Sequence, residues 1–199
     1  MRLVVATGNP HKVEEIGAIL GPDFELVAHE PGVDEDGETF EANALLKARA
    51  VRDATGEAAI ADDSGIEVDS LGGRPGVHSA RWTERGDWIP RLLHEVAGSD
   101  RRCRYVCAAA LALPGGEEHV VRGVVEGVVA DEPRGSGGFG YDPIMVPVEG
   151  DGRTFAQLSP AEKHALSHRG RAFRALLPAL PRMLGPFRGQ SPRKDPTLE

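Results

Sequence analysis

Apolar and polar residues alternate along the chain in patterns that predict a series of strands and helices. Residues 2–7 are an apolar run typical of a strand, and Thr39 is a suitable N-cap for a helix. Gly21 and Gly56 each follow a helical pattern, so each is expected to end a helix. The elements predicted here are a strand at 2–7, a helix from about 11 to 20, a short strand at 24–28, an exposed acidic loop at 31–38 and a helix after Thr39 to about 55.

The middle and the end of the chain predict a hairpin and further helices. Long apolar runs flank Pro114-Gly115-Gly116, a turn signal, so they are expected to pair as antiparallel strands. Ser159 opens a capping-box pattern, and Ser167 is a second N-cap candidate. The elements predicted here are strands at 58–61 and 66–69, a loop at 72–77, a helix over 87–97, hairpin strands at 103–113 and 119–130, a glycine-rich loop at 133–143, and helices after 159 and from 167 to about 184.

The mixture of hairpins and helix-connected strands predicts an α/β fold (mixed α+β) with a mixed sheet. The 199 residues suffice for one sizeable domain or for two small lobes around one core. No internal repeat and no separating linker is visible, so residues 1–184 are expected to form a single domain. The Pro-, Arg- and Gly-rich residues 185–199 are expected to form a flexible C-terminal tail.

Composition narrows the class of protein and its partners. With 23 basic and 31 acidic residues, the net charge of −8 does not suit a protein that binds a nucleic-acid polymer, although a single nucleotide with a metal still fits. No apolar run approaches the roughly 20 residues of a membrane span. The N-terminus has no signal-peptide layout, so a cytoplasmic protein is expected. Cys103 and Cys107 lie in an apolar run and are expected to be reduced thiols in the core.

Residues 58–68 carry the most informative chemistry. An apolar run ends at Asp62-Asp63-Ser64-Gly65, and apolar alternation then resumes with Ile66 and Val68. This pattern predicts a buried strand that stops at a site and continues as a second strand. Two adjacent carboxylates are costly to bury, and a bound Mg²⁺ would relieve that cost. A tight turn is the alternative, because Asp, Ser and Gly all favour turns.

Two other polar segments lie at the starts of predicted helices. Residues 7–12 join a strand to a helix whose N-terminal N–H groups, together with Lys12, could hold phosphate. The Gly-Lys-[Ser/Thr] ending of a P-loop is absent, and a simple capped turn is the alternative. Glu41, in the first turn of the helix after Thr39, could serve a site or merely complement the helix dipole.

The glycine-rich loop and the helix starts after it suggest contacts with a ligand. Four glycines within residues 135–143 expose the backbone, and Phe139 and Tyr141 could stack on a nucleobase or return to the core. Lys163 with residues 168–169 (His-Arg) could bind phosphate or carbonyl oxygens, or could form a solvated basic helix face. The histidine spacing is not that of a zinc site.

Six of these segments together resemble the inosine-triphosphatase family of noncanonical purine nucleoside triphosphate pyrophosphatases. They occur in the family's order, cover residues 3 to about 180, and in combination outweigh the separate alternatives. The matching segments are 6–12 (Ala-Thr-Gly-Asn-Pro-His-Lys), 39–48 (Thr-Phe-Glu-Ala-Asn-Ala-Leu-Leu-Lys-Ala), 61–65 (Ala-Asp-Asp-Ser-Gly), 71–81 (Leu-Gly-Gly-Arg-Pro-Gly-Val-His-Ser-Ala-Arg), 137–143 (Gly-Gly-Phe-Gly-Tyr-Asp-Pro) and 167–170 (Ser-His-Arg-Gly).

The resemblance implies an elongated two-lobed fold with a long mixed β-sheet, a nucleotide cleft between the lobes, a homodimer, and Mg²⁺ as cofactor. The implied reaction is hydrolysis of dITP, ITP and XTP to the monophosphate and pyrophosphate, which would remove deaminated purines from the nucleotide pool. Asp63 would be the general base and a metal ligand, and Glu41 the second metal carboxylate. The implied substrate-binding residues are Thr7, Gly8, Asn9, Pro10, His11, Lys12, Ser64, Phe139, Gly140, Tyr141, Asp142, Lys163, His168 and Arg169.

Two other functions are compatible with parts of the sequence. Related pyrophosphatases acting on modified pyrimidine or guanine nucleotides share the general architecture, but their motif pattern is not found here. A catalytically silent nucleotide-binding module should lack the metal carboxylates, which this chain retains. The chain departs from the inosine-triphosphatase pattern at 83–88, where it is shorter than the family usually is, and this bears on the local loop and on the dimer contact.

Overall fold

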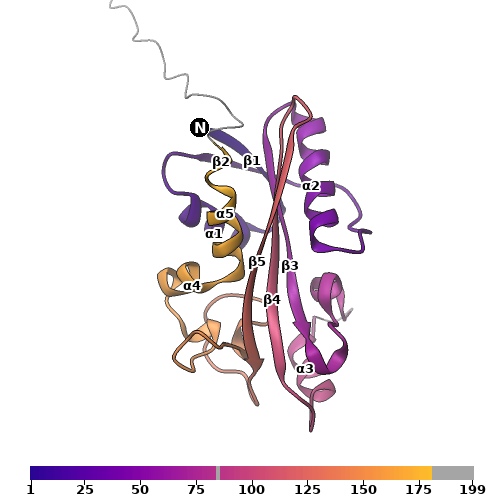
Figure 1. The fold of residues 1–199 in the computed structure, drawn as a ribbon, viewed down its shortest axis with the longest axis vertical. Helices are drawn as coiled ribbons and strands as arrows, with labels where there is room; N and C mark the ends of the chain where they lie inside the picture. Colours follow the sequence, from indigo (N-terminus) through magenta and orange to yellow (C-terminus); the bar gives the residue numbers. More distant parts are fainter. Residues whose placement is uncertain (84–85, 181–199) are drawn as a thin grey trace, which may run out of the picture.

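A six-stranded mixed sheet forms the centre of the computed structural model, which describes residues 1–83 and 86–180 (Figure 1). Its strands are β1 (Arg2–Ala6), β2 (Glu25–His29), β3 (Ala59–Val68), β4 (Arg102–Ala112), β5 (Glu118–Val129) and β6 (Met145–Pro147). The strand order is β2-β1-β3-β4-β5-β6. β1 runs parallel to β2 and β3, and the later neighbours are antiparallel. The mixed sheet predicted from the sequence is confirmed.

Helices cover both faces of this sheet, and the molecule is elongated along β3, β4 and β5 (Figure 1). The α-helices of the described residues are α1 (Pro10–Leu20), α2 (Phe40–Thr55), α3 (Trp88–Glu95), α4 (Pro160–Leu166) and α5 (His168–Leu176). α1 and α5 pack against one face of the sheet, and α2 packs against the opposite face over β3 and β4. α3 belongs to a third apolar cluster with Ile66 and Val68, at the other end of β3.

Local sequence signals determine where the helices begin and end. At the start of α2, Thr39 Oγ1 accepts a hydrogen bond from the N–H of Ala42 at 3.1 Å. After α2, Gly56 has a φ of 69°, a left-handed conformation that favours glycine. Ser159 forms the predicted capping box of α4, and Ser167 caps α5. These four predicted helix boundaries are confirmed.

β3 differs from the prediction. The sequence predicts two strands interrupted at 62–65, but β3 is continuous and pairs with β4 at every residue. Asp62 lies opposite Ala109 and Asp63 opposite Ala108, so the tight-turn alternative is also wrong. Successive side chains of a strand point to opposite faces, and the two carboxylates therefore lie on opposite sides of the sheet. The sequence predicts that burying two adjacent carboxylates is costly because they repel each other. Their placement on opposite sides of the sheet reduces this repulsion.

The helix that Ser167 caps, α5, is shorter than predicted. α5 ends at Leu176 rather than near residue 184. Pro178 follows closely, and its lack of an N–H leaves the helical hydrogen-bond pattern without a donor at that residue. Residues 181–199, which include the predicted tail at 185–199, lie outside the described residues.

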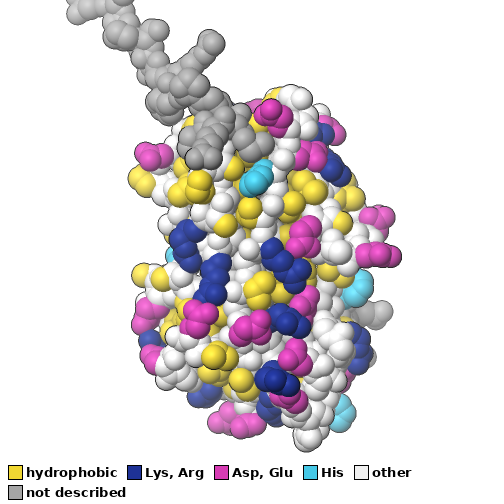
Figure 2. Space-filling model, in the orientation of Figure 1, with side chains coloured by type: hydrophobic (Ala, Val, Ile, Leu, Met, Phe, Trp, Pro, Cys, Tyr) yellow, Lys and Arg dark blue, Asp and Glu magenta, His cyan; other side chains and the backbone are white. Residues whose placement is uncertain are grey.

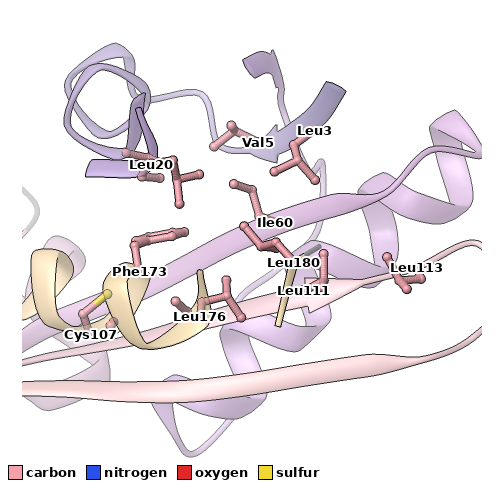
Figure 3. Close-up of a cluster of buried hydrophobic side chains, with 13 residues drawn as sticks. Leu3, Val5, Leu20, Ile60, Cys107, Leu111, Leu113, Phe173, Leu176 and Leu180 are labelled. Atoms are coloured by element: carbon pink, nitrogen blue, oxygen red, sulfur yellow. The ribbon is translucent and has the colours of Figure 1, made fainter. Parts of the chain in front are cut away.

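Apolar clusters hold the helices onto the sheet. On the α1/α5 face, Phe173 and Leu176 pack with Leu3 and Ile60 (Figure 3). On the α2 face, small alanines of α2 meet the alanine-rich β4, which lets the helix lie close to the strands. This close packing brings the polar side chains at the start of α2 within reach of β3.

Both cysteines are buried, free thiols, as predicted. Burial raises the pKa of the Cys103 thiol to about 12 and raises the pKa of Cys107 as well. The thiols therefore stay protonated and serve as core groups.

The outer surface mixes both signs of charge. Figure 2 shows acidic and basic side chains interspersed over the face that it draws. In residues 1–83 and 86–180, no helix combines the length and the apolar character needed to cross a membrane.

Candidate active site

Segments from across the chain surround a cavity of about 330 Å³. They include the turn from β1 into α1, the loop before α2, β3, the glycine-rich loop before β6, and the α4–α5 junction. The residues that line the cavity are Asn9, Lys12, Glu35, Asp63, Ser64, Gly65, Val77, Ser79, Ala80, Trp88, Tyr105, Phe139, Gly140, Tyr141, Asp142, Lys163, His168 and Arg169.

Asp62 anchors two cations on the α1/α5 side of the sheet. Arg169 donates from Nε and Nη2 to Asp62 Oδ2 at 3.2 and 2.9 Å. Lys12 Nζ lies 3.1 Å from Oδ1, an ion pair without an aligned hydrogen bond. Burial alone would raise the pKa of Asp62, but Lys12 and Arg169 outweigh it and hold the pKa well below its usual range. Asp62 is therefore ionised in the folded protein at neutral pH.

Asp63 faces the opposite way, toward α2. It accepts hydrogen bonds from Asn43 Nδ2 at 3.1 Å and from Lys47 Nζ at 3.3 Å. Lys47 Nζ also donates to Glu35 Oε1 at 3.2 Å, so one ammonium group holds two carboxylates. Burial raises the pKa of Asp63, and the charge of Glu35 raises it further, against the opposing effect of Lys47. Asp63 is thus a more basic carboxylate than usual, on the wall of the cavity.

A further buried carboxylate, Glu15, ties α1 to α4 and α5. Its Oε1 lies 2.6 Å from Lys163 Nζ, and its Oε2 accepts from Arg169 Nη1 at 2.5 Å. Burial would raise the pKa of Glu15, but Arg169 and Lys163 outweigh it and lower the pKa. Lys163 also donates to Asp142 Oδ2 at 2.7 Å. Glu15 therefore lies behind the cavity wall and helps to hold both cations of the wall, Lys163 and Arg169, in place.

Asp142 fixes the conformation of the glycine-rich loop. Its Oδ2 accepts from the N–H of Phe139 at 2.8 Å, and its Oδ1 accepts from the Tyr105 hydroxyl at 3.2 Å. Lys163 Nζ lies 4.6 Å from the centre of the Phe139 ring, and the His11 ring stacks on Phe139 at 5.9 Å. The loop therefore presents an aromatic ring to the cavity beside the cations.

His168 lines the cavity and has a buried ring nitrogen without a hydrogen-bond partner in the described part of the chain, as does Trp88 at Nε1. Its ring packs against the Tyr105 ring at 4.6 Å. Burial lowers the pKa of His168, and the positive charges of Arg169 and Lys163 lower it further, so the imidazole is neutral. Nδ1 is buried and has no hydrogen-bond partner within residues 1–83 and 86–180. A neutral ring of this kind can hydrogen-bond a ligand in the cavity.

Glu35 and Asp63 are the carboxylates that suit a metal ion. Within the described ranges, no cluster of three or more His, Cys, Asp or Glu side chains is arranged to hold a metal by itself. Mg²⁺, however, is usually bound by one or two carboxylates and completed by water and substrate phosphates. Glu35 and Asp63 already share one cation, Lys47, and both line the cavity. The residues therefore fit Mg²⁺ when a phosphate substrate is present.

Comparison with known proteins identifies the family. The model of the Ham1 family matches residues 3–179. The chain belongs to the Ham1 family. The resemblance predicted from the six motifs is confirmed over nearly the whole described chain.

Individual relatives agree with this assignment. The "dITP/XTP pyrophosphatase" of Streptomyces coelicolor is 48% identical over 92% of this chain and 99% of its own length. That of Thermus thermophilus is 45% identical over 90% of this chain and 91% of its own. Among solved structures, the Staphylococcus aureus Ham1 protein superposes with a TM-score of 0.80 at 37% identity, over 92% of this chain and 100% of that one. The Ham1 fold is therefore shared along the length of the described residues.

Most residues expected at the site of this Ham1 chain lie together around the cavity. From the predicted set, the residues that line it are Asn9, Lys12, Asp63, Ser64, Phe139, Gly140, Tyr141, Asp142, Lys163, His168 and Arg169. The other members of the phosphate segment, Thr7, Gly8, Pro10 and His11, form the turn into α1 but do not line the cavity. Their roles stay predictions.

Glu41 is placed differently from the expectation. Its Oε1 accepts from Arg122 Nη1 at 3.4 Å, and it does not line the cavity. On α2, residues two apart point to different sides, so a helix that turns Asn43 toward Asp63 turns Glu41 away. The structure offers Glu35 as the partner of Asp63, and a metal-binding role of Glu41 stays a prediction without support from the geometry.

Several site residues were missed by sequence reasoning. Glu35 lies in an acidic loop in which nothing in the sequence tells which carboxylate turns inward. The sequence gives a clearer indication that Lys47 belongs to the site, because the chain has only four lysines and Lys47 shares a helix face with Asn43. Tyr105 and Trp88 come from a central strand and from α3, far along the chain from the motifs, and only the folded sheet brings them to the cavity.

Proposed function

We propose that this chain hydrolyses noncanonical purine nucleoside triphosphates, dITP, ITP and XTP, to the monophosphate and pyrophosphate. The main observation behind this proposal is the buried carboxylate of Asp63, which has a raised pKa and lies near Glu35. Both carboxylates line a cavity that is also lined by Lys12, Lys163 and Arg169. The relatives named dITP/XTP pyrophosphatase, at 45–49% identity, support the same activity. In the cell this activity would remove deaminated purines from the nucleotide pool.

The charges and the aromatic loop suggest how the substrate lies. Lys12 and the N-terminus of α1 favour the phosphates, because helix N–H groups and a cation both attract anions. Lys12 contacts Asp62 only through an ion pair, so it can reach toward a phosphate without breaking an aligned hydrogen bond. Phe139 and the backbone around Gly140 also line the cavity, and an aromatic ring beside exposed backbone suits a base and its sugar.

Asp63 would act as the general base. A carboxylate with a raised pKa accepts a proton more readily, so Asp63 can take one from a water molecule as that water attacks the α-phosphorus. The bond from the α-phosphorus to the bridging oxygen then breaks, and pyrophosphate leaves with its new charge stabilised by Lys12. Mg²⁺ held by Asp63 and Glu35 would offset the negative charge of the phosphates.

His168 is suited to the selection of the base. Hypoxanthine and xanthine carry a 6-oxo acceptor where adenine carries a 6-amino donor. The neutral imidazole, whose Nδ1 has no partner within the described part of the chain, and the neighbouring Arg169 can donate to that oxygen. In the tautomer of His168 protonated at Nδ1, adenine would leave this buried donor unpaired, which costs binding energy.

The resemblance also implies a homodimer, which we retain as part of the proposal. Sedimentation equilibrium of the purified protein tests it directly. A mass equal to the 21.2 kDa of one chain would exclude the dimer.

A nucleotide panel tests the proposed reaction. Pyrophosphate release from dITP, XTP, dGTP and dATP would be measured in parallel with and without Mg²⁺. Mg²⁺-dependent release from dITP and XTP, with little from dGTP and dATP, is expected. Equal release from all four would remove the selectivity, and no release from any would favour a silent nucleotide-binding module.

A further inference from the structure

Asn43 connects the loop that carries Glu35 to the strand that carries Asp63. Its Nδ2 donates to Asp63 Oδ2 at 3.1 Å, and its Oδ1 accepts from the N–H of Gly37 at 2.8 Å. A backbone N–H can only donate and an ionised carboxylate can only accept, so the two partners fix the orientation of the amide. Asn43 is 0% exposed, which protects both hydrogen bonds from water.

Gly37 allows this connection because it has no side chain. A Cβ at residue 37 would lie 2.6 Å from Asn43 Oδ1 and 3.0 Å from the Cβ of Ala42. Any larger residue would therefore push the loop away from α2. The contact is made in the first turn of a helix capped by Thr39, so the helix side of the contact is well ordered.

The Asn43 contact differs from the one that Lys47 makes. Lys47 also joins Glu35 to Asp63, but through its positive charge. A divalent cation that binds the two carboxylates would repel an ammonium group and compete with it. The amide of Asn43 is neutral and uses the backbone of the loop, so it can hold the loop against β3 whether or not a cation is bound.

We propose that Asn43 is the positioning residue of the two metal carboxylates: by joining Gly37 to Asp63, it sets the spacing between Glu35 and Asp63. This inference rests on the proposed function, and it assigns a role to a residue that does not itself line the cavity. Groups that orient metal ligands in this way typically contribute a factor of about 10–100 to metal affinity or activity.

Binding of Mn²⁺, followed by electron paramagnetic resonance with and without saturating dIMP, tests the inference. Asn43→Ala removes both hydrogen bonds. Gly37→Ala leaves Asn43 and Asp63 unchanged and disturbs the contact from the loop side. Val51→Ala is the matched control, because Val51 is a fully buried residue of the same helix that packs only in the apolar cluster. Melting temperatures and the Mg²⁺ concentration for half-maximal dITP hydrolysis would be measured for all four proteins.

Both Asn43→Ala and Gly37→Ala are expected to weaken Mn²⁺ binding about tenfold or more and to raise the half-activating Mg²⁺ concentration similarly. Val51→Ala should lower the melting temperature and leave both metal values unchanged. Wild-type Mn²⁺ affinity in folded Asn43→Ala, or an equal loss in Val51→Ala, would overturn the proposal. If the wild-type protein binds Mn²⁺ but does not hydrolyse dITP, the proposed function fails while the Mn²⁺ comparison still decides the role of Asn43.

Discussion

Asp62 and Asp63 are neighbours in the chain with opposite electrostatic environments. Asp62 meets Lys12 and Arg169, which lower its pKa, whereas Asp63 shares Lys47 with Glu35 and has a raised pKa. The alternation of side chains along β3 produces this difference, because each carboxylate meets a different set of helices. One carboxylate is therefore suited to structure and the other to proton transfer.

Asp63→Asn should abolish most turnover and leave nucleotide binding nearly intact. Asparagine keeps the shape of the side chain but cannot accept a proton from water, so kcat for dITP should fall by about 10²–10⁴-fold. Steady-state kinetics measure kcat, and calorimetry with the product dIMP measures binding. Asp53→Asn, at an exposed position of α2, is the control and should leave both values unchanged. Comparable kcat for wild type and Asp63→Asn would contradict the assignment.

At the residue scale, the sequence could predict the groups that cluster in motifs but not those that reach the site through folding. Lys163, His168 and Arg169 come from one short segment and meet at the cavity as expected. Glu15 is different, because a glutamate one turn after Lys12 is indistinguishable in sequence from a solvated helix residue. Its role depends on two cations that lie about 150 residues away along the chain.

At the scale of elements, the loop before α2 and the start of α2 carry the second carboxylate. Glu35 and Glu41 are both near the helix start, but only Glu35 lines the cavity. Asn43 faces Asp63, and Glu41 pairs with Arg122 on another side of α2. The helix period therefore separates residues that the sequence places in one motif.

A paired substitution separates these two glutamates. Glu35→Gln should raise the Mg²⁺ concentration needed for half-maximal dITP hydrolysis by about tenfold or more, because a metal site with one carboxylate binds more weakly. Glu41→Gln should leave that concentration within about twofold of wild type. Mg²⁺ titrations of initial rates provide the values, and a large shift in Glu41→Gln with none in Glu35→Gln would reverse the assignment.

Element boundaries were predictable where a specific local interaction sets them. Thr39, Gly56, Ser159 and Ser167 each end or begin a helix as expected. β3 was misjudged because Asp and Gly are poor strand formers, and the pairing with β4 overrides that preference. Gly65 remains in the strand for a packing reason: a Cβ there would lie 2.4 Å from Ser79 Oγ.

At the scale of the whole molecule, buried ion pairs join elements that are distant in sequence. Arg169 of α5 contacts Glu15 of α1 and Asp62 of β3, all with little exposure to solvent. Removing one partner of such a group leaves an uncompensated buried charge, which costs about 3–5 kcal/mol. Arg169, which lines the cavity, therefore also contributes to the stability of the fold.

Acid should destabilise the protein through these carboxylates. The pKa values of Asp62 and Glu15 are lowered in the folded protein, so the stabilisation that they provide is complete above their unfolded values, near pH 4, and is lost as the pH falls below them. Asp63 changes the free energy of unfolding in the opposite direction, because its raised pKa makes protonation favour the folded state. The shift of Asp62 is the large one of the three, and the free energy of unfolding should therefore fall from about pH 5 to pH 3.

Urea unfolding at pH 7, 5, 4 and 3 measures this dependence in the wild type and in Asp62→Asn. The variant should be less stable by about 3–5 kcal/mol at pH 7, since Arg169 loses a buried anionic partner. The difference between the two proteins should shrink toward pH 3, because Asp62 takes up a proton in the unfolded wild type below about pH 4 while it stays ionised in the folded protein, and the stabilisation by its lowered pKa is lost. Glu14→Gln, an exposed substitution beside Glu15 on α1, should follow the wild-type curve. A constant difference between wild type and Asp62→Asn at every pH would show that the charge of Asp62 is not the source of its stabilising effect.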